Sequence, residues 1–246
     1  MPEQYAIIIG SGFEEFASGT ELITKETRFG APSASLRSTV IAGTPVITIA
    51  RHGEPHCIPP HAINYRANLM ALKAAGVTSV IALCTVGVVS AIRDSGEIGL
   101  PDQILDFTWG RDHSIYDGTD GELQHIDFTE PFSSVVRAGL LQAARSAAID
   151  CYDGGVYAAT QGPRLESAAE VDHLERVGAD YVGMTAMPEA ALARELGIEY
   201  ACLALVVNRA AGRSDTPIHD DVEASTESAR SLTESLLHGF FGSTGE

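Results

Sequence analysis

Residues 45–68 decide the fold: PVITIA at residues 45–50 is followed by RHGEPHCIPPHAINYRAN at residues 51–68. The first part is an apolar, β-branched run that predicts a buried strand, and the last part begins a segment with helical spacing. The loop between them carries Arg51, three histidines and three prolines that stiffen it. Open α/β sheets place anion and small-molecule sites on loops at the carboxyl ends of their strands. The stretch therefore predicts an α/β fold with a site after this strand.

The alternation of strand and helix continues along the chain. Residues 61–75 have apolar side chains at helical spacing and end at Gly76, and TSVIALC at residues 78–84 predicts a second buried strand. Strand, crossover helix and strand form a βαβ unit, whose strands are parallel. The same reasoning predicts strands at residues 5–9, 155–160, 180–185 and 200–208, and helices at residues 139–148, 167–177, 188–196 and 220–241.

The whole pattern predicts a single domain over residues 1–246. Its fold is expected to be α/β, with a mixed, largely buried β-sheet flanked by helices. Residues 109–132 fit neither the strand nor the helix pattern, and they are rich in Asp, Gly and His. We predict that they form a long functional loop.

Composition excludes several classes of function. The 33 acidic residues outnumber the 16 Lys and Arg, and the formal charge of −17 argues against nucleic acid or an anionic membrane surface as partner. No apolar run approaches ~18 residues and the N-terminus has no signal-peptide pattern, so we expect no membrane span. The four cysteines are widely spaced without a CxxC pair, which is typical of thiols in a reducing compartment. We therefore expect a soluble, cytoplasmic protein.

Polar side chains follow the predicted buried strands, at the ends that converge in such folds. They are Ser11, Arg51, His52, Thr85, Thr185 and Asn208. Hydroxyls together with a guanidinium and an imidazole suit an oxyanion, and phosphate is the commonest such ligand. Taken singly, the hydroxyl residues could be ordinary turn or strand-end residues, whereas an arginine directly after an apolar strand is not easily a solvated one. We predict a phosphate site.

Other chemistries lack their patterns. The sequence contains neither GxSxG nor HExxH, which argues against an acyl-transfer serine and a zinc site. His52, His56 and His61 are spaced by four and five residues, but the prolines between them prevent the first two from sharing a helical face. We therefore predict no metal site and expect His56 and His61 to have structural or supporting roles.

Three blocks of sequence resemble the purine nucleoside phosphorylase and methylthioadenosine phosphorylase family. They are ARHG at residues 50–53 with NYRAN at 64–68, GPR at 162–164 with Glu166, and GADYVGMT at 178–185 with PEA at 188–190. The matches run from residue 6 to residue 212 in the family's order, and within the family the chain is most similar to the bacterial enzymes that act on S-methyl-5′-thioinosine. The resemblance implies that phosphate attacks C1′ of a purine nucleoside and releases the base and a ribose 1-phosphate, without a cofactor.

The resemblance also implies a role for each candidate residue. Phosphate would be bound by Ser11, Arg51, His52, Thr85 and Thr185, ribose by Met184, and the base by Leu165, Glu166 and Asn208; Asn208, Arg51 and His52 would be the catalytic residues. Leu165 stands where many relatives have a stacking phenylalanine, so base stacking should be weaker or differently shaped. His125 matches the residue that a neighbouring subunit lends to the 5′ pocket. This implies a homo-oligomer, with a trimer favoured over a hexamer.

The choice of base follows from chemistry. A 6-oxopurine presents O6 and N1–H, and its N7 must be protonated as it leaves. An asparagine can donate to O6 and accept from N7–H, while a carboxylate can accept from N1–H. Asn208 and Glu166 therefore predict hypoxanthine over adenine, and we expect S-methyl-5′-thioinosine and phosphate as substrates. A general inosine and guanosine phosphorylase, a methylthioadenosine phosphorylase and a non-catalytic nucleoside-binding homologue remain the alternatives.

Overall fold

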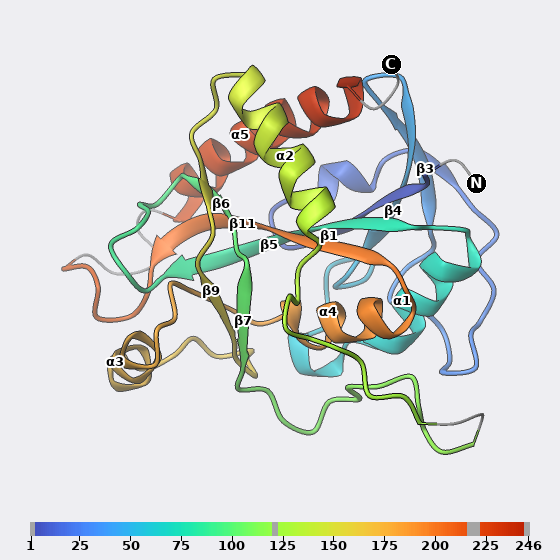
Figure 1. The fold of residues 1–246 in the computed structure, drawn as a ribbon, viewed down its shortest axis with the longest axis horizontal. Helices are drawn as coiled ribbons and strands as arrows, with labels where there is room; N and C mark the ends of the chain where they lie inside the picture. Colours follow the sequence, from blue (N-terminus) through green and yellow to red (C-terminus); the bar gives the residue numbers. More distant parts are fainter. Residues whose placement is uncertain (1–2, 120–122, 216–221, 244–246) are drawn as a thin grey trace.

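A mixed sheet of eleven strands lies at the centre of the protein, and helices cover its faces (Figure 1). The structure is a computed structural model, and it describes residues 3–119, 123–215 and 222–243. The strands are β1 (Tyr5–Ile9), β2 (Thr20–Glu21), β3 (Arg37–Ile41), β4 (Thr44–Ala50), β5 (Ser79–Val88), β6 (Ile98–Leu100), β7 (Gln103–Asp106), β8 (Cys151–Asp153), β9 (Val156–Ala159), β10 (Tyr181–Gly183) and β11 (Glu199–Arg209). The helices are α1 (Tyr65–Ala74), α2 (Ser134–Ser146), α3 (Ala168–Arg176), α4 (Ala186–Glu195) and α5 (Val222–Ser243), with short 3₁₀ helices η1 (Glu14–Ala17) and η2 (Pro60–Ala62).

The middle of the sheet is parallel. β4, β1, β5 and β11 lie side by side in that order, and one row of paired residues runs through Thr48, Ile7, Ile81 and Ala201. β10 then pairs antiparallel with the far end of β5 and parallel with β9, so the sheet is mixed. The predicted α/β fold with a mixed, helix-flanked sheet is confirmed.

Alternate residues of the strands contribute to two apolar layers. In β1, Ala6 and Ile8 join the layer under α1 and α4, while Tyr5, Ile7 and Ile9 join the layer under α2 and α5. Figure 1 shows these two helix pairs on opposite faces of the sheet. Because both faces are covered, the central strands are apolar along their whole length, which is why they could be recognised in the sequence.

Two central strands are longer than predicted, and this changes the setting of one site residue. β5 and β11 pair from Ser79 and Glu199 as far as Val88 and Arg209. Thr85 therefore lies inside β5, and the prediction that it follows its strand is wrong; Asn208 was predicted as the last residue of its strand and is the last but one of β11. The strands are longer because β5 and β11 continue to pair their backbone N–H and C=O groups beyond the apolar run. A register shift just before Asn208 accompanies the change.

Helix starts depend on capping residues. α1 begins at Tyr65, four residues later than predicted, because the Asn64 side chain accepts the Ala67 N–H at 3.1 Å. α2 begins at Ser134, five residues earlier than predicted, because the Ser133 hydroxyl caps it. The expected capping box at the start of α3 is confirmed.

The ends of the sheet and of the chain differ most from the prediction. The short strands β2, β3, β6, β7 and β8 were not predicted, because they are short or partly exposed. β3 and β4 form a hairpin through Ala42 and Gly43, whose φ angles of 49° and 87° are typical of a two-residue primed turn. The predicted start of α5 at residue 220 lies outside the described residues, and Phe240 and Phe241 of this helix are buried.

The segment between β7 and α2 contains no helix or strand in its described residues, 107–119 and 123–133, as expected for residues 109–132. Among the described residues, no helix is long and apolar enough to cross a membrane.

Candidate active site

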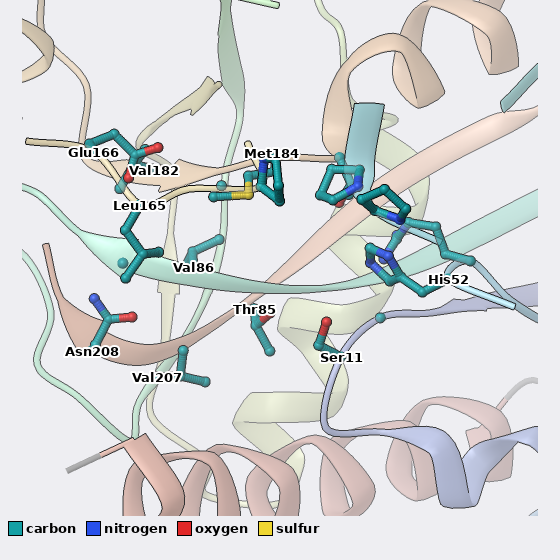
Figure 2. Close-up of a pocket in the computed structure, with 18 of the residues that line it drawn as sticks. Ser11, His52, Thr85, Val86, Leu165, Glu166, Val182, Met184, Val207 and Asn208 are labelled. Carbon is teal, nitrogen blue, oxygen red and sulfur yellow. The ribbon is translucent and has the colours of Figure 1, made fainter. Parts of the chain in front are cut away.

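A cavity of about 470 Å³ lies at the ends of the central strands, and nine of the ten predicted site residues line it. They are Ser11, Arg51, His52, Thr85, Leu165, Glu166, Met184, Thr185 and Asn208. Figure 2 shows that the cavity has two ends: Ser11, Thr85 and His52 lie at one, Leu165, Glu166 and Asn208 at the other, and Met184 lies between them. Residues from six segments of the chain thus converge on one site.

The first end offers hydroxyl groups next to a tight backbone turn. Ser11 follows β1, Thr85 lies in β5 and Thr185 follows β10. A Cβ atom added to Gly10 would lie 2.4 Å from the Leu83 carbonyl oxygen and 2.8 Å from Nη1 of Arg51. Only glycine therefore lets the turn before Ser11 approach β5 and Arg51 this closely.

Arg51 reaches the same end, but its charge is already paired. The side chain is almost fully buried, and its Nε and Nη2 atoms donate to the two carboxylate oxygens of Glu189 at 2.5 and 3.0 Å. Tyr200 donates a further hydrogen bond to Glu189 at 2.8 Å. Burial alone would lower the pKa of Arg51, but Glu189 outweighs it and holds that pKa well above its ordinary value. Arg51 is a cation whose charge Glu189 compensates.

The pairing limits what Arg51 can offer to a ligand. Nη1 donates to the Leu83 carbonyl oxygen and Nη2 also contacts the Cys84 sulfur, so one Nη1 hydrogen has no partner among the described residues. That nitrogen faces Gly10, beside the turn. Glu189 was not predicted as a site residue, although an acid inside the apolar run PEAALA was a signal for a buried partner.

His52 is held in one tautomer. Its Nδ1 lies 2.8 Å from the Ile58 carbonyl oxygen, and because a carbonyl only accepts, Nδ1 carries the proton. Burial and the nearby charge of Arg51 lower the pKa of His52 to about 4. At neutral pH the ring is therefore uncharged and Nε2 holds a lone pair. The ring stacks on His56, which also lines the cavity and contacts Glu14 at 3.0 Å.

The lowered pKa of His52 predicts a stability change in acid. The unfolded chain binds this proton near pH 6.5 and the folded chain only near pH 4, so folding stability is intact above pH 6.5 and is lost as the pH falls between these values. For His52 alone we expect the free energy of unfolding to fall by about 2 kcal/mol between pH 7 and pH 4.5. Urea unfolding of the wild type and of His52→Gln at pH 7 and pH 4.5 gives the fall in the free energy of unfolding for each protein. The contribution of His52 is the fall in the wild type minus the fall in His52→Gln. Equal losses in the two proteins would contradict it.

The second end combines a carboxylate with an amide. Glu166 is half-buried, and its Oε1 accepts a hydrogen bond from the Thr160 hydroxyl at 2.6 Å. Asn208 donates from Nδ2 to the Arg209 carbonyl oxygen at 2.8 Å, and it packs on Gly87, where an added Cβ would lie 3.1 Å from Nδ2. A donor and an acceptor group are therefore available to the edge of a heterocycle. Thr160 was not predicted.

Met184 lies between the two ends and is tightly supported from behind. Gly162 has a φ of +59°, and a Cβ atom there would lie 2.4 Å from the Met184 sulfur. The apolar residues Leu165 and Val86 lie on the same stretch of cavity in Figure 2. The middle of the cavity therefore has apolar surface on which a flat or cyclic group could rest.

His125 is the predicted residue that the structure does not bring to the cavity. It is exposed in the segment between β7 and α2, and it is not among the lining residues of this chain. His61 is also exposed and does not line the cavity. Among the described residues, no group of three or more His, Cys, Asp or Glu side chains is arranged to hold a metal ion.

A two-ended cavity at the strand ends of a mixed sheet defines the class of the protein: an α/β protein with a small-molecule site. A family model described as Phosphorylase superfamily matches residues 4–241, and the chain belongs to this family. The resemblance noted in the sequence is thereby confirmed, and the protein is an enzyme of the phosphorylase type.

Individual relatives are similar over nearly the whole chain. A probable S-methyl-5′-thioinosine phosphorylase of Xanthomonas campestris is 43% identical over 242 residues, which cover 95% of this chain and 97% of that protein. A 6-oxopurine nucleoside phosphorylase of Pyrococcus furiosus is 40% identical over 225 residues, 88% of this chain and 84% of that protein. The solved structure of a Schistosoma mansoni adenosine/methylthioadenosine phosphorylase variant with adenine superposes with a TM-score of 0.91 at 28% identity and covers 99% of this chain and 91% of the other.

Proposed function

We propose that this enzyme catalyses the phosphorolysis of S-methyl-5′-thioinosine to hypoxanthine and 5-methylthioribose 1-phosphate. Inorganic phosphate is the co-substrate, and no cofactor takes part. The observation that carries the proposal is that hydroxyls and His52 form one end of a cavity and Glu166 and Asn208 form its other end. Phosphorolysis needs this arrangement, because phosphate must sit beneath C1′ while the purine leaves on the far side.

Phosphate binds at the end formed by the hydroxyls of Ser11, Thr85 and Thr185. Arg51 donates one hydrogen bond to phosphate from its free Nη1 hydrogen. A bidentate contact is not available, because Nε and Nη2 donate to Glu189. His52 has its lone pair on Nε2, so it accepts the hydrogen of the P–OH group of HPO₄²⁻. The ionised oxygens of phosphate then remain free to attack C1′ and to stabilise the oxocarbenium-like transition state.

The base binds at the other end. Asn208 donates to O6 and accepts from N7–H as the purine leaves, and Glu166 accepts from N1–H. Leu165, which is 43% exposed, closes the cavity over the base in place of an aromatic ring. Adenine presents a bare N1 and an amino group, which leaves Glu166 and Asn208 without matched partners. The name of the Pyrococcus relative, a 6-oxopurine nucleoside phosphorylase, supports this choice of base.

A 5′-methylthio group is preferred to a 5′-hydroxyl group. The loop that carries His52 also lines the cavity with Ile58, Pro59 and Pro60, which give apolar surface for a thioether. The name of the Xanthomonas relative supports the same substrate. The corresponding inosine and guanosine activity is the second candidate, because the base-binding residues would serve it equally well.

We propose that the enzyme works as a homo-oligomer, with a trimer favoured, in which His125 completes the 5′ pocket of a neighbouring subunit. His125 is exposed here, and the same segment exposes the apolar side chains of Trp109 (71%) and Leu123 (67%), which a neighbouring subunit would cover. The wide spacing of the four cysteines supports the cytoplasm as the location.

The substrate assignment is tested by comparing kcat/KM for S-methyl-5′-thioinosine, inosine and S-methyl-5′-thioadenosine, each with saturating phosphate. We expect S-methyl-5′-thioinosine to be the fastest and S-methyl-5′-thioadenosine to be slower by roughly 10⁴-fold, since its base leaves two polar groups unmatched. Faster turnover of S-methyl-5′-thioadenosine would show the base assignment to be wrong, and equal turnover of inosine would favour the second candidate.

A further inference from the structure

A buried guanidinium, that of Arg111, joins the ends of two strands behind the purine end of the cavity. It donates to the carbonyl oxygens of Thr160 (3.2 Å), Gln161 (2.9 Å), Met184 (2.7 Å) and Met187 (2.7 Å) and to the Tyr65 hydroxyl (3.2 Å). Arg111 is 9% exposed, and the acceptors of its guanidinium among the described residues are four carbonyl oxygens and one hydroxyl, all uncharged. It therefore acts as a clamp on backbone carbonyl groups.

The clamp holds the backbone of Thr160. The Thr160 N–H donates to the Gly183 carbonyl oxygen at 2.8 Å, and its own carbonyl oxygen accepts from Arg111. The Thr160 hydroxyl has two acceptors in reach, Oε1 of Glu166 at 2.6 Å and the Gly183 carbonyl oxygen at 3.3 Å, and the shorter contact to the charged carboxylate is the stronger one. This bond joins two residues of one loop, between the end of β9 and the start of α3.

Glu166 has room to move if that bond is lost. Its side chain lines the substrate cavity and also a second cavity of about 470 Å³, which Thr160, Phe107 and Trp109 line as well. The carboxylate thus stands in the wall between two spaces. A half-buried glutamate with space on both sides needs a partner to keep it on one side.

We propose that Thr160 is a positioning residue that sets the specificity of the enzyme for 6-oxopurines. Its hydroxyl takes Oε1 of Glu166 and leaves Oε2 for the N1–H of the base, so that the carboxylate meets hypoxanthine with an acceptor already in place. The same arrangement disfavours adenine, whose N1 is itself an acceptor. This inference rests on the proposed function, in which Glu166 recognises the base.

The test is a double-mutant cycle with Thr160→Val, Glu166→Gln and the double variant, and Thr160→Ser as the control that keeps the hydroxyl. Thr160→Val should lower kcat/KM for S-methyl-5′-thioinosine roughly 10-fold or more, because it removes a hydrogen bond to a charged group, while the KM for phosphate stays unchanged. Thr160→Ser should recover most of the loss. In the Glu166→Gln background, Thr160→Val should have less than about a twofold further effect. The same loss in both backgrounds would show a merely structural role and overturn the proposal.

A binding measurement separates this inference from the proposed function. Calorimetric titration with free hypoxanthine and with adenine needs no turnover. We expect Thr160→Val to weaken hypoxanthine binding roughly 10-fold and not to weaken adenine binding. If Thr160→Val binds hypoxanthine more weakly than the wild type but the wild type catalyses no phosphorolysis, the proposed function fails and the inference stands. If the wild type catalyses phosphorolysis and Thr160→Val binds hypoxanthine as tightly as the wild type, the inference alone fails.

Discussion

Replacing Asn208 by Asp should lower kcat/KM for S-methyl-5′-thioinosine by roughly 10²–10³-fold, the cost of losing one donor to a developing charge. An aspartate has nearly the same shape, but it cannot donate to O6 of the purine and places a negative charge beside it. Activity on S-methyl-5′-thioadenosine should fall much less, because a carboxylate can accept from the amino group of adenine. The ratio of the two kcat/KM values should therefore shift toward the adenine substrate.

The matched control for this variant is Gln142→Glu, which adds the same charge on the exposed side of α2, away from the cavity. It should leave both kcat/KM values unchanged. An Asn208→Asp enzyme with the substrate ratio of the wild type would show that Asn208 does not read the base.

Replacing Glu189 by Gln should lower the free energy of unfolding by about 3–5 kcal/mol, because it leaves the buried charge of Arg51 without a counter-charge. Glu189 is fully buried, and its carboxylate accepts hydrogen bonds from Arg51 and Tyr200. The loss is measured by urea unfolding at pH 7. The double variant Arg51→Met with Glu189→Leu should recover most of the stability, since an apolar pair of similar volume replaces the ions, but it should raise the KM for phosphate.

The exposed ion pair of Arg37 with Glu54, at 2.7 Å, gives the control. Glu54→Gln removes a carboxylate from a guanidinium in the same way but in contact with water, and it should cost far less stability than Glu189→Gln. A Glu189→Gln protein as stable as Glu54→Gln would contradict a tightly coupled buried pair.

The central strands could be predicted because burial on both faces leaves a continuous apolar run in the sequence, as in β4 and β5. Strands near the end of the sheet, such as β3, are partly exposed and mix polar with apolar residues, so their pairing depends on neighbours that the sequence does not show. Helix boundaries followed local capping groups. Ser167 was recognised by its capping box, while Asn64 and Ser133 lacked that second signal.

The convergence of Ser11 and Arg51 could be predicted because they follow neighbouring parallel strands, whose carboxyl ends lie together. Thr185 reaches the same cavity from β10, which runs antiparallel to β5. The hydrogen-bond partners of these residues could not be predicted. Arg51 and Glu189 are 138 residues apart, and nothing local in the sequence joins them. The state of His52 depends on the Ile58 carbonyl group and on burial, which only the folded chain provides.

The central claim is that one cavity holds phosphate at the hydroxyl end and a purine at the amide end, so that phosphate attacks C1′ as the purine leaves. Phosphorus NMR of the enzyme with S-methyl-5′-thioinosine and inorganic phosphate tests it directly, with hypoxanthine measured in the same sample. We expect a sugar 1-phosphate signal to grow in a one-to-one ratio with released hypoxanthine, and no base release without phosphate. Hypoxanthine released without a sugar phosphate, or no release at all, would contradict the account.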